Sequence, residues 1–249
     1  MKKELEIKAQ KPNKVRHACA EISLAKFEYI FRDEPPKSLS ELQQIVGPLL
    51  QKYHAYLKMD EKPEKGDRKM ADEMVLLIAD VIDSYLTKGT AQGDPVDKGE
   101  KLKLHLFKSC LLELAYEHSN YNFDMQISLM KSYDQLGLSV SYAEAFETLG
   151  IKGVQLETLG YLRTHHPMKW LNYSQFTTSH NKYFKYLRFN AKEMGDIKLL
   201  AATQKNFGQL ENFIEYESYL SKSYFTYFAH EFFNKTRLSL NQIMNQSNQ

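Results

Sequence analysis

Few positions in the 249-residue sequence combine residue types and spacing that can perform chemistry. The segment His230-Glu231-Phe232-Phe233-Asn234 is one residue short of a His-Glu-x-x-His zinc motif, because asparagine stands where the second imidazole is required. His165 and His166 are neighbours, so on a helix their side chains diverge by about 100° and are poorly placed to share a metal. Helix termination before Pro167 explains this pair better. We therefore expect neither segment to hold a metal.

Other catalytic patterns are missing from the sequence. It contains no Gly-x-x-x-x-Gly-Lys phosphate loop, no Gly-x-Gly-x-x-Gly and no Gly-x-Ser-x-Gly nucleophile elbow. Cys110 stands near Lys108, but its place on an apolar stripe predicts a buried, inert thiol rather than a nucleophile. The sequence therefore predicts a protein that is not an enzyme and that holds no cofactor or metal.

One stretch of the chain segregates positive charge. Between Thr158 and Lys192 there is no acidic residue, and the basic residues are Arg163, Lys169, Lys182, Lys185, Arg188 and Lys192. On a helix over residues 170–194, an apolar stripe is formed by Phe176, His180, Tyr183, Leu187 and Met194. The candidate partner-binding residues Lys182, Lys185, Arg188 and Lys192 lie away from that stripe. They form either a surface for phosphate, RNA or an acidic partner, or an ordinary solvated helix face.

A second stretch is unusually aromatic. Ten of the twenty-seven residues from Phe207 to Phe233 are Phe or Tyr, and they do not fit on one apolar stripe. The members in question are Phe213, Tyr216, Tyr224, Tyr227, Phe228 and Phe232. Either the fold itself or another chain is expected to cover a helix that is apolar on two sides.

Composition favours helices that position these residues. Eleven glycines and seven prolines are few for this length, and the net charge is only +2. Cys19 and Cys110 fit free thiols of a reducing compartment, and no secretory signal begins the sequence. The most apolar stretch, 74–82, contains Asp80 and is too short to span a membrane. We expect a soluble, intracellular, mostly helical chain.

Periodicity and breaker residues predict the helix boundaries. The expected helices are 13–32, 38–57, 67–88, 95–118, 122–136, 141–149, 154–164, 170–194, 196–203 and 206–235. Asn13 is the expected first cap, Ser38 or Ser40 opens the second helix with Glu41 in a capping box, and Gly47-Pro48 predicts a kink or break. Asp94-Pro95 is read as N-cap and first helical proline of the fourth helix.

Short helix pairs within residues 122–165 follow the pattern of a helical repeat. Tyr133, Ala143 and Phe146 stand at plausible tetratricopeptide positions, although the tryptophan and the Leu-Gly pair of the first helix are absent. This pattern by itself leaves an α-solenoid and an irregular helical bundle open.

Two runs within residues 121–163 are typical of one protein family. The first is Phe123–Tyr133 followed by Leu136-Gly137, an apolar helix with a tyrosine and a Leu-Gly turn. The second, Leu149–Leu162, is similar to that family's Ile-Lys-x-Ile-Gln-x-Asp-Thr-x-Gly-Tyr stretch. The chain thus resembles the auxiliary subunit of the N-terminal acetyltransferase B (NatB) complex. The similarity continues to about Leu238 and fades before about Met70.

The resemblance implies a non-catalytic scaffold, a tetratricopeptide-like superhelix that wraps a catalytic subunit of the Gcn5-related acetyltransferase fold. It implies a complex that acetylates Met-Asp, Met-Glu, Met-Asn and Met-Gln N-termini as chains leave the ribosome. The catalytic subunit holds acetyl-CoA, and its pyrophosphate loop is absent from this sequence. Family members are several times longer, so this chain is expected to match a central to C-terminal portion.

These observations predict an all-α, tetratricopeptide-like helical-repeat solenoid, an irregular α-α superhelix. We expect residues 1–249 to form one domain, with a charged linker near 58–68 and the family-like segment at 70–238. The expected location is the cytoplasm, and the expected function is to bind and position the catalytic subunit. The ribosome is the expected further partner, and no membrane is involved. The alternative is a free-standing helical-repeat adaptor that binds RNA or the ribosome through the basic side of residues 163–192.

Overall fold

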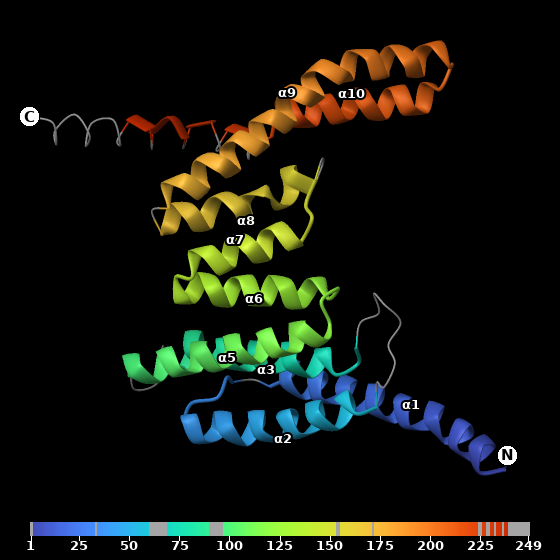
Figure 1. Ribbon diagram of the computed structural model, residues 1–249, viewed down its shortest axis with the longest axis vertical. Coiled ribbons are helices and arrows are strands. Elements are labelled where there is room, and N and C mark those ends of the chain that lie inside the picture. The colour runs from blue at the N-terminus through green and yellow to red at the C-terminus, as the bar shows by residue number, and fades with distance from the viewer. Residues whose placement is uncertain are drawn as a thin grey trace, which may run out of the picture. The chain divides into compact units, whose positions relative to one another are not determined.

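The chain is all-α wherever the structure describes it. The computed structural model describes residues 2–32, 34–59, 69–89, 97–152, 155–170, 172–223 and short stretches between 226 and 238, and these contain no strand. The helices are α1 (Lys2–Ile30), α2 (Leu39–Leu57), α3 (Asp72–Ser84), the π-helix η1 (Tyr85–Gly89), α5 (Lys98–His118), α6 (Phe123–Leu136), α7 (Ser139–Thr148), α8 (Gln155–Lys169), α9 (Tyr173–Thr203) and α10 (Phe207–Ser221) (Figure 1). Several helices that follow one another pack side by side, as in α5 with α6, α8 with α9 and α9 with α10. The prediction of an all-α helical-repeat fold is confirmed.

The helices group into two compact units, residues 1–141 (unit 1) and 142–249 (unit 2). The centre of unit 1 is α3, which packs against α1, α2, α5 and α6. Contact on several sides explains why most of its residues are buried: Asp72, Met74, Val75, Leu77, Ile78, Ala79, Val81 and Ile82. The apolar run of residues 74–82 is therefore a core helix, as its length indicates.

Unit 2 is built differently, as a succession of helices with no central one. α9 packs against α8 on one part of its length and against α10 on another. The first half of α7 is joined to α8 by the hydroxyl of Tyr142, which donates a hydrogen bond of 2.6 Å to the Leu162 carbonyl. The predicted stripe of α9 is confirmed, since Phe176, His180, Tyr183 and Met194 are buried and Leu187 is half-buried.

Two glycines end helices as the sequence predicts. Gly137 follows α6 with φ of 73°, and Gly150 follows α7 with φ of 63°. Both angles lie in the left-handed region, which glycine adopts without the steric cost of a Cβ. The expected turns after residues 136 and 149 are therefore confirmed.

The beginning of the chain departs from the prediction. α1 begins at Lys2, so Asn13 is not a helix cap. Residues 2–11 are rich in Lys and Glu and contain Leu, Ala and Gln, all of which favour helix strongly enough to continue it through Pro12. The cap of α2 is confirmed at Ser38, whose Oγ accepts a 3.2 Å bond from the Glu41 amide. The Glu41 carboxylate reaches back one residue further than in a regular capping box, to the Lys37 amide at 2.9 Å.

Of the kink or break expected at Gly47-Pro48, the break does not occur, because α2 is continuous from Leu39 to Leu57. Burial of Val46 and Leu49 on either side of the pair stabilises the helix against the loss of one backbone bond. The cap of α5 is Asp97, whose carboxylate accepts from the Gly99 amide at 2.9 Å. Asp94-Pro95 and residues 60–68 of the expected linker lie outside the described residues.

Three boundaries in unit 2 are also wrong. α8 passes through Pro167 and ends at Lys169, and α9 continues through Gly195, where a second helix was expected to begin. A single glycine costs a helix only about 1 kcal/mol relative to alanine, and packing against α10 outweighs that cost. α10 ends at Ser221 rather than near residue 235. The Ser223 hydroxyl accepts from the Thr226 amide at 3.2 Å, a cap-like bond that competes with helix continuation.

Candidate partner-binding surface

The basic residues singled out in the sequence lie on the solvent side of α9, opposite its buried stripe. Lys185, Arg188 and Lys192 are exposed, and their spacing of three and four residues places them on one side of the helix. No ion pair joins these three to any described residue. Lys182 differs, because its ammonium group lies 2.8 Å and 3.0 Å from the two carboxylate oxygens of Glu147.

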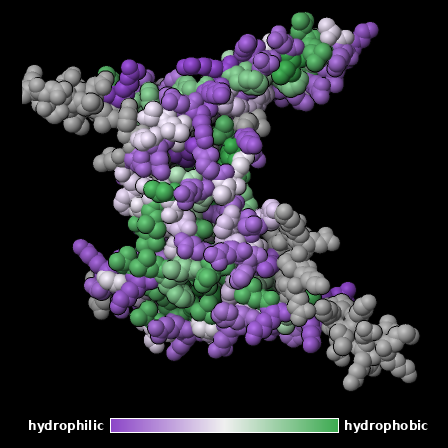
Figure 2. Space-filling model, viewed as in Figure 1, coloured by the Kyte–Doolittle hydropathy of each residue, from purple (hydrophilic) through white to green (hydrophobic). Residues whose placement is uncertain are grey.

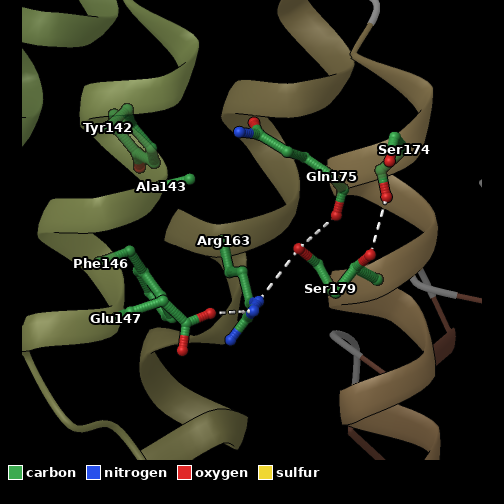
Figure 3. A pocket seen from close by; sticks show the side chains of 9 residues that line it. Tyr142, Ala143, Phe146, Glu147, Arg163, Ser174, Gln175 and Ser179 are labelled. Carbon is green, nitrogen blue, oxygen red and sulfur yellow. Dashed lines mark hydrogen bonds and ion pairs between the residues drawn. The ribbon is translucent and has the colours of Figure 1, made fainter.

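Glu147 binds a second cation as well. The guanidinium of Arg163 in α8 donates to Glu147 in α7, while its Nε donates a 3.0 Å bond to the Ser179 hydroxyl of α9 (Figure 3). Arg163 also lies over the ring of Phe146, 5.3 Å from the ring centre. One carboxylate and one guanidinium thus connect three successive helices, a link that the sequence run without acids does not reveal.

The two cations differ in how firmly they are held. The Arg163 side chain is 13% exposed, whereas Lys182 is 49% exposed. Burial alone would raise the pKa of Glu147, but the bonds from Lys182 and Arg163 outweigh it and hold that pKa below its ordinary value. Glu147 is therefore a stable anion at neutral pH, and the excess positive charge lies at the exposed Lys182.

Glu147 and Arg163 border a hollow of about 150 Å³ within unit 2 (Figure 3). Its lining consists of Tyr142, Ala143, Phe146, Glu147, Arg163, Ser174, Gln175, Thr178 and Ser179. The Ser179 hydroxyl is occupied, donating a 2.7 Å bond to the Gln175 carbonyl. The hollow combines aromatic walls and hydroxyl groups with the paired Glu147 and Arg163, which suits a neutral side chain that forms hydrogen bonds, such as an amide. It contains no pairing of nucleophile and base.

A buried carboxylate nearby was missed by sequence reasoning. Glu157 of α8 is buried, and accepts hydrogen bonds from the hydroxyls of Tyr183, at 2.6 Å, and of Ser223. Burial, followed by the hydrogen bond to Glu157, raises the pKa of Tyr183 above its ordinary value. This cluster joins α8, α9 and the segment after α10, so its role is structural. The only signal in the sequence is the position of Glu157 inside the family-like run 149–162.

His180 and His230 lie among aromatic rings. His180 is buried among aromatic rings, stacked 3.6 Å from the Phe233 ring centre and 4.2 Å from that of Phe184. Desolvation, with a smaller contribution from His230, lowers the pKa of His180 to about 4. His230 itself faces the Phe184 ring, and no metal-binding group of histidine, cysteine or acidic residues occurs among the described residues. The side chains of His165 and His166 lie outside the described part.

Two further predictions can be compared with the structure. Cys110 is exposed, so the prediction of a buried thiol is wrong. α5 buries Lys108, Ser109, Leu111 and Leu112 instead and turns Cys110 outward.

In the aromatic stretch of residues 207–233, Phe213 and Tyr216 are half-buried and Tyr227 is exposed. Tyr224, Phe228 and Phe232 lie outside the described residues.

The arrangement defines a class of protein: in its described part the chain is an all-α helical-repeat protein. No described helix is long and apolar enough to cross a membrane. Residues 1–244 match the family model of the N-acetyltransferase B complex (NatB) non catalytic subunit. The chain belongs to this family, and the match includes the first 69 residues as well as the segment on which the resemblance rested.

Individual relatives are similar at modest identity. The human protein named N-alpha-acetyltransferase 25, NatB auxiliary subunit, is 26% identical over 179 residues, which cover 72% of this chain and 17% of the relative. The Aedes aegypti phagocyte signaling-impaired protein is 32% identical over 108 residues, 43% of this chain and 11% of the relative. The Drosophila pseudoobscura pseudoobscura protein of that name is 26% identical over 120 residues, 48% and 12% respectively. The matched part of the chain thus spans less than a fifth of each relative.

Proposed function

We propose that the chain acts as part of a non-catalytic scaffold of the NatB complex, binding and positioning a catalytic acetyltransferase subunit for N-terminal acetylation during translation. The observation that carries this proposal is the family match over residues 1–244. The name of the human relative, an auxiliary subunit of NatB, supports the same role. The helical-repeat fold is suited to it, because stacked helix pairs offer long surfaces to a partner.

We propose further that residues 1–249 form a single cytoplasmic, tetratricopeptide-like helical-repeat domain. Its partner surface includes Lys182, Lys185, Arg188 and Lys192, which would contact acidic side chains of the catalytic subunit or the ribosome. Support comes from the exposure of the last three residues and from their position on one side of α9. Lys182 contributes least, because Glu147 already neutralises part of its charge.

Co-expression with the NatB catalytic subunit of the same species, followed by affinity capture through a tag on this chain, tests the proposal. We expect a complex that acetylates a Met-Asp peptide, whereas this chain alone neither binds acetyl-CoA nor acetylates the peptide. Reversal of charge at Lys185, Arg188 and Lys192 to Glu should weaken the complex. The same change at Lys98, Lys101 and Lys103 of α5 is the matched control. A catalytic subunit that never co-purifies would contradict the scaffold role.

A second function has its own supporting observation. Three exposed cations without an acidic partner among the described residues also suit an adaptor that binds RNA or the ribosome. Three phosphate contacts predict a slope of about −2 in log affinity against log salt for single-stranded RNA. RNA binding with that slope, lost in the triple Glu variant and without a catalytic subunit in the capture, would favour the adaptor. Absence of RNA binding at low salt would exclude it.

A further inference from the structure

α10 leaves one whole side without a partner in the described structure. The helix packs chiefly against α9, held there by a contact between the hydroxyls of Tyr186 and Tyr216 and by an ion pair of Lys198 with Glu217 at 2.6 Å. None of its residues is buried. The side turned away from α9 is called the outer face below, and it comprises Phe207, Glu211, Ile214, Glu215, Ser218, Tyr219 and Lys222, which recur at spacings of three and four.

The outer face carries three large apolar side chains that are exposed. Phe207 is 67% exposed, Ile214 52% and Tyr219 55%. Hydrophobic side chains are visible on the surface of the α9–α10 hairpin in Figure 2. A single exposed apolar side chain is ordinary, but Phe207 and Ile214 are seven positions apart and lie on one line of the helix, which is the spacing that docks another helix. Tyr219 lies about 140° further round the helix, on the other side of the glutamates.

The charges on the outer face are mostly negative. Glu211 and Glu215 lie one turn apart, and neither is in an ion pair with a described residue. A broad hollow of about 850 Å³ begins beside them, lined by Glu157, Ile214, Glu215, Ser218, Tyr219, Lys222 and Ser223. The carboxylate of Glu157, bound only by hydroxyl groups, adds to the negative potential there. Lys222 is the one cation of the face and stands at its end.

We infer that the outer face of α10 docks an amphipathic helix of a protein partner whose polar margin carries lysine or arginine. Apolar residues of that helix pack on Phe207 and Ile214, while its cations lie opposite Glu211 and Glu215, which stand beside that line. The end of the docked helix that approaches Lys222 is free of positive charge. This inference rests on the shape and charge of unit 2 and not on the proposed NatB function.

A synthetic helix tests the inference with the complete 249-residue chain. The probe is a fluorescein-labelled peptide of about 20 residues with leucine at positions one and four of each heptad and lysine beside them. Two control peptides carry glutamate in place of lysine, or the same composition in scrambled order. Fluorescence anisotropy at low salt should show binding of the basic amphipathic helix and of neither control.

Variants locate the binding on the outer face. Glu211→Lys with Glu215→Lys should weaken binding about tenfold, and Lys222→Glu should strengthen it about threefold. The matched control, Glu144→Lys with Asp196→Lys, makes the same change in net charge on exposed residues of α7 and α9 and should leave affinity unchanged. Ile214→Ser should weaken binding without loss of helicity by circular dichroism.

The outcomes that would overturn the inference are distinct. They are no binding of the basic helix, equal binding of the scrambled or acidic peptide, and equal weakening in the control variant. A fourth outcome is that a second copy of this chain, rather than a helix of another protein, binds the outer face. If sedimentation shows the chain associating with itself, and charge reversal at Glu211 and Glu215 abolishes that association while the peptide fails to compete, the face binds another copy. Loss of NatB assembly in capture experiments would leave the peptide result unaffected.

Discussion

α3 and α10 are helices of similar length with opposite surroundings. α3 contacts helices on several sides and buries most of its residues, whereas α10 buries none. The core of unit 1 is largely aliphatic, but α9 in unit 2 is packed through Phe176, His180 and Tyr183. The difference teaches that hydrophobic residues are placed in two ways in this chain. In unit 1 they are buried and stabilise the fold, whereas on α10 Phe207, Ile214 and Tyr219 remain exposed.

The contrast between α3 and α10 predicts the largest difference in stability. Ile78→Ala in α3 should lower the free energy of unfolding by about 4 kcal/mol, because Ile78 is fully buried and the change leaves a cavity. Ile214→Ala in α10 should change it by less than about 0.5 kcal/mol. Urea unfolding followed by circular dichroism measures both. Equal costs would show that α10 is covered in solution.

The second-largest loss of stability is expected at the buried polar groups of unit 1. Asp72 accepts hydrogen bonds from the side chains of Ser119, at 2.6 Å, and Asn122, at 2.9 Å, in a fully buried position. Asp72→Ala leaves both donors without that acceptor and should cost about 3 kcal/mol. The exposed Asp124→Ala on α6 is the control in the same urea titration. A cost below that of the control would mean that water replaces the carboxylate.

His180 makes the stability of unit 2 depend on pH. Its pKa of about 4 in the folded chain lies below the value near 6.5 of an unfolded imidazole, so the unfolded chain binds the proton more readily. The stabilisation is complete above pH 6.5 and is lost as pH falls to 4, by roughly 2 to 3 kcal/mol. The measurement is the difference in unfolding free energy between wild type and His180→Leu across that range. A difference that does not vary with pH would show that His180 is not buried in solution.

The smallest expected difference in stability is between removing Arg163 and removing Lys182, the two cations that bind Glu147. Arg163→Met removes a mostly buried guanidinium that binds two helices and should cost about 1 to 2 kcal/mol. Lys182→Met should cost less than about 0.5 kcal/mol, because an exposed ion pair contributes little. Thermal unfolding in low and high salt distinguishes them. If Lys182→Met proves the costlier change, Lys182 rather than Arg163 holds α7 to α9.

Sequence reasoning succeeded where one local rule decided the outcome. Ser38 caps α2, Gly137 and Gly150 end helices, and the α9 stripe faces the core, because each depends on neighbouring residues alone. It failed where tertiary contacts overrode a local breaker. Packing carried α9 through Gly195, just as burial on both sides carried α2 through Pro48.

The site shows the same division between local and long-range information. The basic side of α9 was predicted because helical spacing alone places its residues together. Glu147 and Glu157 were missed because their partners lie 16 to 66 positions away in the chain. No periodic pattern in one sequence reports such pairs. Cys110 was misassigned because α5 carries apolar residues on more than one side, so its stripe did not reveal the buried face.

The two exposed thiols allow a dye to be attached to unit 1 alone. Cys19 and Cys110 are its only cysteines, and both belong to unit 1. A maleimide dye added to the unmodified chain therefore labels unit 1 at two known helices and leaves unit 2 dark. Fluorescence from those dyes reports opening of unit 1, while the emission of Trp170, the single tryptophan of the sequence, follows unit 2, so both units can be monitored in one sample without any engineered residue.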